Sequence, residues 1–432
     1  MSLQVILAVA VFVGAYILIA TEKVNRVAAA LGGAALMVLI GATSDHEAFF
    51  SEETGIDWNV IFLLLGMMII VGVIGQTGLF EYLAIWASKR ARAKPYRVMV
   101  MLVVITAVAS ALLDNVTTVL LVAPVTLLVC ERLGVPPIPY LLAEVMASNI
   151  GGTATLIGDP PNIIIASRAG LTFNDFVLNL APIVVILLIV FIGMCRVMFR
   201  RAFIADPARA ARVMALEERE AISDPRLLKR SLAVLVAVVI GFAAHSVVPL
   251  EPSMVALLGA GAIVLVSGLP PRTYLADVEW ETLAFFAGLF IMVGALVNLG
   301  VIEELGRAAT EAVGDRYLLA VTGLLFGSAV LSGIVDNIPY VATMAPLVKD
   351  MVDAGGGSVQ ANSLWWALAL GADLGGNATA VGASANVVVL GIAKKNGYPI
   401  SFWEFTKYGL IVAAVTVTLS WPYLWLRYFV FA

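Results

Sequence analysis

The chain has 432 residues, of which only 13% are charged, about half the ~25% that is usual in soluble globular proteins. Apolar residue types make up 61% of the sequence, which leaves too little polar surface to cover a folded body of this size in water and excludes an ordinary soluble enzyme. The 26 basic and 30 acidic side chains leave a net charge of −4, so the lipid bilayer is an expected partner and nucleic acid is not.

Eight apolar segments approach the ~20 residues that a helix needs to cross a bilayer. In chain order, the predicted spans are Leu3–Ala20, Val27–Ala42, Asn59–Phe80, Phe176–Phe199, Leu232–Pro249, Ser253–Ser267, Thr282–Leu299 and Gly409–Val430. Four more regions are apolar but carry Asp, Asn, Gly or Pro in their middle: residues 98–133, 139–167, 317–351 and 364–393. Because an unsatisfied backbone group facing lipid is costly, these regions are predicted to be broken helices buried in protein, the first and third as re-entrant hairpins.

The distribution of basic side chains predicts the orientation in the membrane. With two re-entrant hairpins and an external N-terminus, 21 of the 26 Lys and Arg residues fall on the inner side. The positive-inside rule therefore favours a multi-pass protein of the cell inner membrane with both termini external. The polar segment 200–230 is rich in Ala, Glu and Arg and is predicted to be a helical cytoplasmic linker.

The sequence repeats itself at an offset of about 220 residues. A shift of 222 positions carries Asp114-Asn115 onto Asp336-Asn337 and Gly66 onto Gly288, and a shift of 224 carries Gly151-Gly152 onto Gly375-Gly376. Each half would hold five spans and one hairpin, an odd number, so the second copy must enter the membrane upside down. The predicted fold is an all-α membrane protein with ten spans, built as an inverted repeat of residues 1–199 and 231–432.

Inverted repeats with interrupted helices at matching positions are typical of secondary transporters, whose site lies where the breaks meet. A duplicated channel or enzyme is the alternative. The hairpin breaks read Asp114-Asn115-Val-Thr117 and Asp336-Asn337-Ile-Pro. Capping alone could explain Asp and Asn there, but Ser or Asn would cap a helix without placing a carboxylate at membrane depth. We therefore predict that Asp114 and Asp336 bind Na⁺ or a transferable proton.

The second pair of breaks is rich in glycine and in side-chain oxygens. The glycines free the backbone from helical angles, and the oxygens suit a hard monovalent cation, whereas half-helix N-termini facing the same cavity would favour an anion. The candidate residues are Asn149, Thr153, Thr155, Asp159 and Asn162 in the first copy and Asp373, Asn377, Thr379 and Asn386 in the second. Sodium is predicted near Asp114 with Asn149 and near Asp336 with Asp373.

The two copies differ in their carboxylates, and a transporter needs only one of two related sites to carry a proton. Asn149 matches Asp373, Asp159 matches Ala383, and Glu144 matches Leu368. The proton-coupling candidates are Asp114, Asp336, Glu144 and Asp373, and the alternative role for Glu144 is a hydrogen bond between helices. No cofactor is predicted, and because no GxxxxGK[ST] loop is present, coupling to ATP would need a separate subunit.

These motifs resemble the ion transporter superfamily, in particular the branch of ArsB-type arsenite permeases and the melanosomal P protein. The likeness is carried by Asp114-Asn-Val-Thr-Thr-Val-Leu-Leu, Ala143-Glu-Val, Asp336-Asn-Ile-Pro and the segments from Asn149 to Asn162 and from Leu374 to Asn386. The Gly-Asp-Pro-Pro-Asn string within them is closer to the P-protein type.

The resemblance implies an elevator transporter, in which two hairpins and two broken helices slide against a scaffold, often within a homodimer. Members include Na⁺-coupled dicarboxylate carriers and Na⁺/H⁺ antiporters. By motif, the residues implied to line the site are Asp114, Asn115, Asp336 and Asn337 at the hairpin tips and Asn149, Thr153, Thr155, Asp373, Asn377 and Thr379 at the breaks.

The predicted function is ion-coupled secondary transport of a small inorganic anion or metalloid, with H⁺ or Na⁺ as the coupling ion and efflux of arsenite or antimonite as a specific case. A Na⁺/H⁺ antiporter is the alternative within the same fold, and a passive anion channel is the alternative of another class. Besides the bilayer and the small ion, the expected partners are a second copy of the chain and, in an arsenite system, an ATPase subunit.

Overall fold

A computed structural model describes residues 2–431 of the chain except 22, 205–208, 210, 212–213, 215–216, 245–249 and 315, and within this part the secondary structure is helical, without strands. The helices before the linker are α1 (Leu3–Thr21), α2 (Arg26–Leu39), α3 (Asp45–Phe50), α4 (Trp58–Gly75), α5 (Leu79–Arg90), α6 (Pro95–Leu112), α7 (Asn115–Leu133), α8 (Ile138–Gly152), α9 (Pro160–Ala169) and α10 (Phe173–Met198). The 200–230 linker, only part of which is described, contains the short 3₁₀ turns η1 (Arg200–Ala202) and η2 (Glu218–Ala221).

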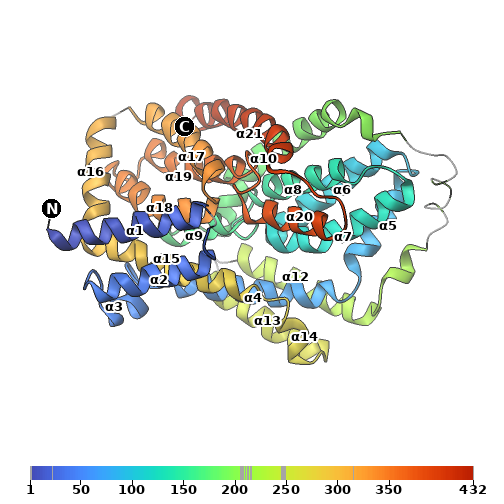
Figure 1. Cartoon of the computed structure of the whole chain (residues 1–432), viewed down its shortest axis with the longest axis horizontal. Helices are drawn as coiled ribbons and strands as arrows, with labels where there is room; N and C mark the ends of the chain where they lie inside the picture. Colours follow the sequence, from blue (N-terminus) through green and yellow to red (C-terminus); the bar gives the residue numbers. More distant parts are fainter. Residues whose placement is uncertain are drawn as a thin grey trace.

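The second half contains helices in a matching order. They are α12 (Pro225–Ala243), α13 (Pro252–Ser267), α14 (Pro271–Leu275), α15 (Trp280–Asn298), α16 (Val301–Val313), α17 (Tyr317–Ile334), α18 (Asn337–Ala354), α19 (Val359–Gly375), α20 (Ser384–Lys395) and α21 (Phe402–Trp425), followed by a π-helical turn, η3 (Leu426–Val430). The short helices α5 and α16 lie at opposite ends of the long axis of the molecule (Figure 1).

All four interrupted regions are broken where the sequence predicts. The first hairpin breaks between α6 and α7, and the second between α17 and α18. The other two regions break between α8 and α9 and between α19 and α20. Within the described part of the chain, eight helices are long and apolar enough to cross a membrane: α1, α4, α6, α7, α10, α15, α17 and α21 with its extension. The protein is therefore a multi-pass integral membrane protein.

This set of helices differs in part from the predicted spans. Helices α2 and α13, predicted to span, are shorter apolar helices of 14 and 16 residues. The predicted span Leu232–Pro249 overlaps α12, which is not among the eight, and its residues 245–249 lie outside the described part of the chain. Three of the four hairpin arms, predicted to be re-entrant, are long enough to cross on their own. Hydropathy does not separate the two cases, because a re-entrant arm and a full span both satisfy their backbone groups internally.

The helices pack in two groups that we call the flanking group and the central group. The flanking group comprises α1, α2, α4, α12, α13 and α15, and its closest pairs, α4 with α13 and α2 with α15, each join one helix from each half. The central group comprises α6 to α10 and α17 to α21, where α6 packs on α8 and α17 on α19. The polar breaks lie inside the central group, and contacts between the two groups are sparser.

Matched glycines permit the closest approaches between flanking helices. A methyl group on Gly66 would lie 2.7 Å from the backbone carbonyl carbon of Ala256, and one on Gly288 would lie 2.7 Å from that of Ala30. Helices in lipid associate through such small residues because no hydrophobic force favours their contact. The two glycines that coincide at an offset of 222 thus serve the same packing role in each half.

We expect Gly66→Val and Gly288→Val each to destabilise the folded protein by about 2 kcal/mol or more, because the branched side chain must push two backbones apart. Thermal unfolding of purified protein in detergent measures this effect. Gly32→Val is the matched control, since no atom lies within 4 Å of the place where its Cβ would be. A control variant as unstable as the other two would show that valine itself, and not the helix contact, causes the loss.

Candidate functional site

Each hairpin tip is an aspartate that caps the second arm. Asp114 Oδ1 accepts a hydrogen bond from the Thr117 amide at 2.7 Å, and its Oδ2 accepts one from the Thr117 hydroxyl at 2.5 Å. Asp336 Oδ1 accepts from the Ile338 amide at 3.0 Å, and its Oδ2 accepts from Ser384 Oγ at 2.7 Å. Both carboxylates therefore form N-caps, as the sequence predicts, and Thr117 lies at the predicted site as a partner of Asp114.

The threonines of the breaks attach each break to the neighbouring hairpin. Thr155 Oγ1 donates to the Ala111 carbonyl and Thr379 Oγ1 donates to the Gly333 carbonyl, both at 2.6 Å. Thr153 Oγ1 donates to the Asn149 carbonyl within its own helix at 2.8 Å. The Thr155 and Thr379 protons thus satisfy carbonyls at the ends of the first hairpin arms. Each of these two hydroxyl oxygens also accepts a backbone hydrogen bond, from Gly158 and Val381 respectively, so only part of its lone-pair capacity remains for an ion.

Asp159 joins the two hairpin tips. The Asn115 side-chain amide donates to Asp159 Oδ2 at 3.0 Å, and the Asn337 amide donates to Asp159 Oδ1 at 3.3 Å. Asp159 is completely buried, and its counterpart in the second half is Ala383. A carboxylate that has no counterpart in the second half therefore accepts hydrogen bonds from the matching asparagines of both halves.

Asn149 makes the second connection between the halves. Its amide nitrogen donates to Asn377 Oδ1 at 3.0 Å and to Asn386 Oδ1 at 3.1 Å, while its own Oδ1 accepts from Asn115 at 3.1 Å. Asn386 in turn donates to the Gly376 and Thr379 carbonyls. The structure thus brings residues of all four breaks into one continuous, buried hydrogen-bonded network.

Asp373 occupies the position in the second half that Asn149 occupies in the first, but its environment differs. Both of its carboxylate oxygens are buried, and neither accepts a hydrogen bond of good geometry from a described residue, although the side chains of Thr153 and Asn162 lie close enough to interact with it. Thr153 and Asn162 lie beside it, and Asn162 Oδ1 is likewise buried without a partner. Burial of a polar group without a hydrogen-bond partner costs free energy, which a bound proton or cation would offset. We call these oxygens of Asp373, Asn162 and Thr153 the Asp373 cluster.

The site is strongly acidic. Asp114, Asp336 and Asp373 are all close enough to Asp159 to repel its negative charge. Arg26, at the start of α2, lies 3.7 Å from Asp336 Oδ2 at the edge of the site, and it is the only cation among the described residues for which we find an ion pair with these four carboxylates. Four carboxylates with one cation in a low-dielectric interior require neutralisation by protons or bound cations.

Glu144 lies outside this network. It is buried on α8, accepts a hydrogen bond from Thr126 on α7, and has one oxygen, Oε2, without a partner in the described part of the chain. This contact is a hydrogen bond between helices, which is the alternative role considered for Glu144 from the sequence.

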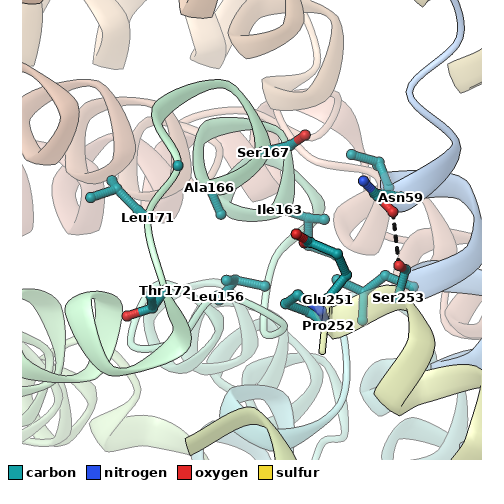
Figure 2. A pocket seen from close by; sticks show the side chains of 13 residues that line it. Asn59, Leu156, Ile163, Ala166, Ser167, Leu171, Thr172, Glu251, Pro252 and Ser253 are labelled. Carbon is teal, nitrogen blue, oxygen red and sulfur yellow. Dashed lines mark hydrogen bonds between the residues drawn. The ribbon is translucent and has the colours of Figure 1, made fainter. Parts of the chain in front are cut away.

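A pocket of about 280 Å³ opens between α4, α9 and α13 (Figure 2). Leu156, between α8 and α9, and Ile163, on α9, line one side of the pocket. Asn59 and Ser253 face them and are joined by a hydrogen bond of 2.8 Å from Ser253 Oγ to Asn59 Oδ1 (Figure 2). The sequence did not predict a role for Asn59 and Ser253, nor for Arg26 and Ser384, because a single polar residue at a helix start carries no distinctive pattern.

The fold and this network define an integral membrane transporter with its polar site at the meeting of broken helices. Residues 16–371 match the citrate transporter family, CitMHS, and the chain belongs to this family. An uncharacterised transporter of Mycobacterium tuberculosis is 60% identical over 98% of this chain and 99% of its own length. The human P protein is 34% identical over 98% of this chain and 60% of its own length, which confirms the resemblance to the P-protein type.

A solved structure supports the same fold. The crystal structure of the YdaH transporter of Alcanivorax borkumensis superposes with a TM-score of 0.60 at 15% identity, covering 91% of this chain and 88% of that one. The family and these relatives are transporters and not enzymes.

Asp114→Asn and Asp336→Asn are each expected to abolish ion-coupled transport with little loss of folded protein. The neutral amide can still accept the capping hydrogen bond, but it cannot bind a proton or balance a cation. Driven uptake in proteoliposomes, with thermal unfolding in parallel, separates the two effects. Unchanged uphill transport in both variants would eliminate the tip carboxylates from the coupling mechanism.

Proposed function

We propose that the protein is a secondary active transporter that moves a small inorganic anion or metalloid against its gradient, coupled to H⁺ or Na⁺. The observation that carries the proposal is the Asp373 cluster, in which a buried carboxylate lacks a partner at the meeting of the four breaks. A group of this kind is stable in a membrane interior only when an ion neutralises it, so binding of that ion changes the energy of the site.

Two copies of one unit in opposite orientation would explain the matched packing. The pairs α6 with α8 and α7 with α20 have counterparts in α17 with α19 and α18 with α9. The sparse contacts between the flanking and central groups support an elevator cycle, in which the central group carries the site past the flanking group. The two copies are residues 1–199 and 231–432, and a homodimer formed through the flanking group would anchor that group in the membrane.

The coupling ion is H⁺ or Na⁺. Side-chain oxygens of Asp373, Asn162 and Thr153 offer the hard ligands that Na⁺ prefers, while Asp373 alone would bind a proton. The Asp114, Asn149 and Asp336 positions stay further candidates for sodium. The sodium and proton alternatives differ in which gradient drives transport.

The carboxylates and amide oxygens of the site favour a metalloid hydroxide over a simple anion as the cargo. Arsenous acid is neutral at neutral pH and carries three hydroxyl groups, which can donate hydrogen bonds to carboxylates and to amide oxygens. An anion would instead meet four carboxylates and needs their prior neutralisation. The family description names citrate, so an organic carboxylate is the class of cargo to compare with arsenite and antimonite.

A solute panel in proteoliposomes tests this proposal. Uptake of arsenite, antimonite, phosphate and citrate is measured with an imposed proton gradient or an imposed Na⁺ gradient, and with each gradient collapsed by an ionophore. The proposal predicts accumulation of arsenite or antimonite above its external concentration with only one of the two gradients. Flux that merely equilibrates, and does not saturate, would contradict it and would indicate a passive channel.

A Na⁺/H⁺ antiporter is the second candidate, because the described network holds four carboxylates and a single cation at its edge. In that case the carboxylates are themselves the exchange site. A change of internal pH on addition of Na⁺, in proteoliposomes without arsenite or any other test solute, distinguishes this function from the first.

The proposed location is the cell inner membrane, with both termini external and the 200–230 linker cytoplasmic. An ATPase subunit would join only in an arsenite system. Proteolysis of sealed vesicles at the linker tests the orientation, since only vesicles with the cytoplasmic face outside expose it.

A further inference from the structure

Arg26 connects the two helix groups beside the polar site. It is the first residue of α2, and its Nη1 donates to Ser384 Oγ at 2.7 Å. The same Ser384 hydroxyl donates to Asp336 Oδ2 at 2.7 Å, and that oxygen lies 3.7 Å from Arg26 Nη1. The guanidinium also lies over the Phe285 ring of α15, 5.6 Å from its centroid. One side chain of the flanking group is thus attached to a hairpin tip and to a half-helix of the central group.

The contact lies where a sliding motion between the groups would have to break it. Asp336 and Ser384 belong to the central group, whereas Arg26 and Phe285 belong to the flanking group. The Asp336 side chain is 16% exposed and that of Arg26 is 35% exposed, so the pair is partly shielded from solvent. Displacement of the central group separates the charges and costs this interaction.

The start of α13, which corresponds to the start of α2, borders an open pocket. Helix α13 pairs with α4 as α2 pairs with α15, and α13 begins at Pro252 where α2 begins at Arg26. The pocket of about 280 Å³ lies at this start of α13, against α4 and α9 (Figure 2). Asp114 is not among the residues that line this pocket; it is hydrogen-bonded to Thr117 of its own hairpin and lies close enough to Glu279 to interact with it. The two groups are therefore joined by the arginine contact at the start of α2, whereas a pocket lies between them at the start of α13.

Arg26 also has a second acidic neighbour on its own side. Glu279 immediately precedes α15 and is close enough to Arg26 and to Asp114 to interact with both electrostatically. One of its oxygens, Oε1, is buried without a partner in the described part of the chain. When Asp336 moves away from Arg26, Glu279 can form an ion pair with Arg26 instead, so the arginine keeps an acidic partner.

We propose that Arg26 is a positioning residue that locks the transporter in the state described here: its contact with Asp336 and Ser384 holds the central group against the flanking group in the position in which the pocket between α4, α9 and α13 is open. The inference rests on the proposed transport cycle. Arg26 then determines which of the two access states is favoured, and it does not bind the cargo.

A cysteine reporter in the pocket tests this inference without any cargo. Leu171→Cys places a thiol on the pocket wall at a position that is only partly buried, and the rate of its modification by a membrane-impermeant thiosulfonate is measured in proteoliposomes. The two native cysteines are buried, and the chain without the reporter supplies the blank rate. In the reporter background, Arg26→Gln is expected to slow modification about tenfold, the size of a typical coupling between two states, because the unlocked protein favours closure of the pocket.

Three further variants separate the lock from simple damage to the fold. Arg26→Lys keeps the charge and should restore most of the labelling rate, and Ser384→Ala, which removes the bridging hydroxyl, should give an intermediate rate. Arg196→Gln is the matched control, since Arg196 makes the same kind of ring contact, with Tyr96, at the start of α6 and far from its tip. It should label as the parent does.

Equal labelling in the parent and Arg26→Gln, or slow labelling in Arg196→Gln as well, would overturn the lock. If Arg26→Gln is too unstable to purify, the rates of Arg26→Lys and Ser384→Ala decide. Because the assay needs no transported solute, its failure leaves the proposed transport function intact, and a failure of the solute panel leaves the labelling result interpretable.

Discussion

Asp373→Asn is expected to reduce ion-driven transport at least a hundredfold while the folded protein remains as stable as the parent or becomes more stable. The carboxylate is buried with both oxygens unpaired, so its ionised form costs free energy that a neutral amide does not. The same replacement removes the only group of the Asp373 cluster that can carry a charge. Gradient-driven uptake and thermal unfolding, measured on one preparation, give both quantities.

The matched control for this variant is Asn149→Asp, which puts a carboxylate at the equivalent place in the first half. Asn149 donates hydrogen bonds to Asn377 and Asn386, and a carboxylate cannot donate them, so this variant should lose stability. Loss of stability in Asp373→Asn together with full driven transport would reverse both expectations and remove Asp373 from the coupling mechanism.

Asp159→Ala is expected to have the largest combined effect, with loss of transport and a decrease of about 2–4 kcal/mol in the free energy of unfolding. The alanine leaves the Asn115 and Asn337 amides without their common acceptor in a buried place, and each unsatisfied donor costs about 1–3 kcal/mol. Urea or thermal unfolding in detergent measures the change.

Asp159→Asn separates the hydrogen bonds from the charge. Its amide oxygen still accepts from one asparagine, so stability should fall less than in Asp159→Ala, whereas transport should still be impaired. Alanine is the native residue at the matching position, Ala383, which shows that the second half forms its break without this carboxylate. Equal stability of Asp159→Ala and the parent would mean that the two hairpin tips are held together by packing alone.

Local sequence patterns predicted the breaks of this fold well. Asp114 and Asp336 mark hairpin tips because an aspartate in an apolar stretch is a poor helix residue and a good cap. The repeat offset also pairs Gly66 with Gly288, and the structure shows that both lie at close helix contacts, a role that was not predicted for them. These features depend on a few neighbouring residues or on an internal match, and both can be read from the chain.

The partners within the site could not be predicted in the same way. Nothing in the sequence around Asp159 indicates that it binds Asn337, 178 positions away, or that Arg26 reaches Ser384, 358 positions away. Such contacts depend on how the two halves pack and not on local propensity. The short helix α5 and the amphipathic helix α16 were also missed, because a short polar segment after a span reads equally well as a loop.

Ion-dependent thermal stability tests the central claim most directly, because it asks whether the buried carboxylates bind the coupling ion. Unfolding of the purified parent and of Asp373→Asn is followed in sodium chloride and in choline chloride at equal ionic strength, at mildly acidic and at neutral pH. A ligand that binds only the folded state stabilises it, so one of the two ions should raise the melting temperature of the parent by several degrees and leave that of Asp373→Asn unchanged. An equal response of the two proteins to both ions would contradict the account.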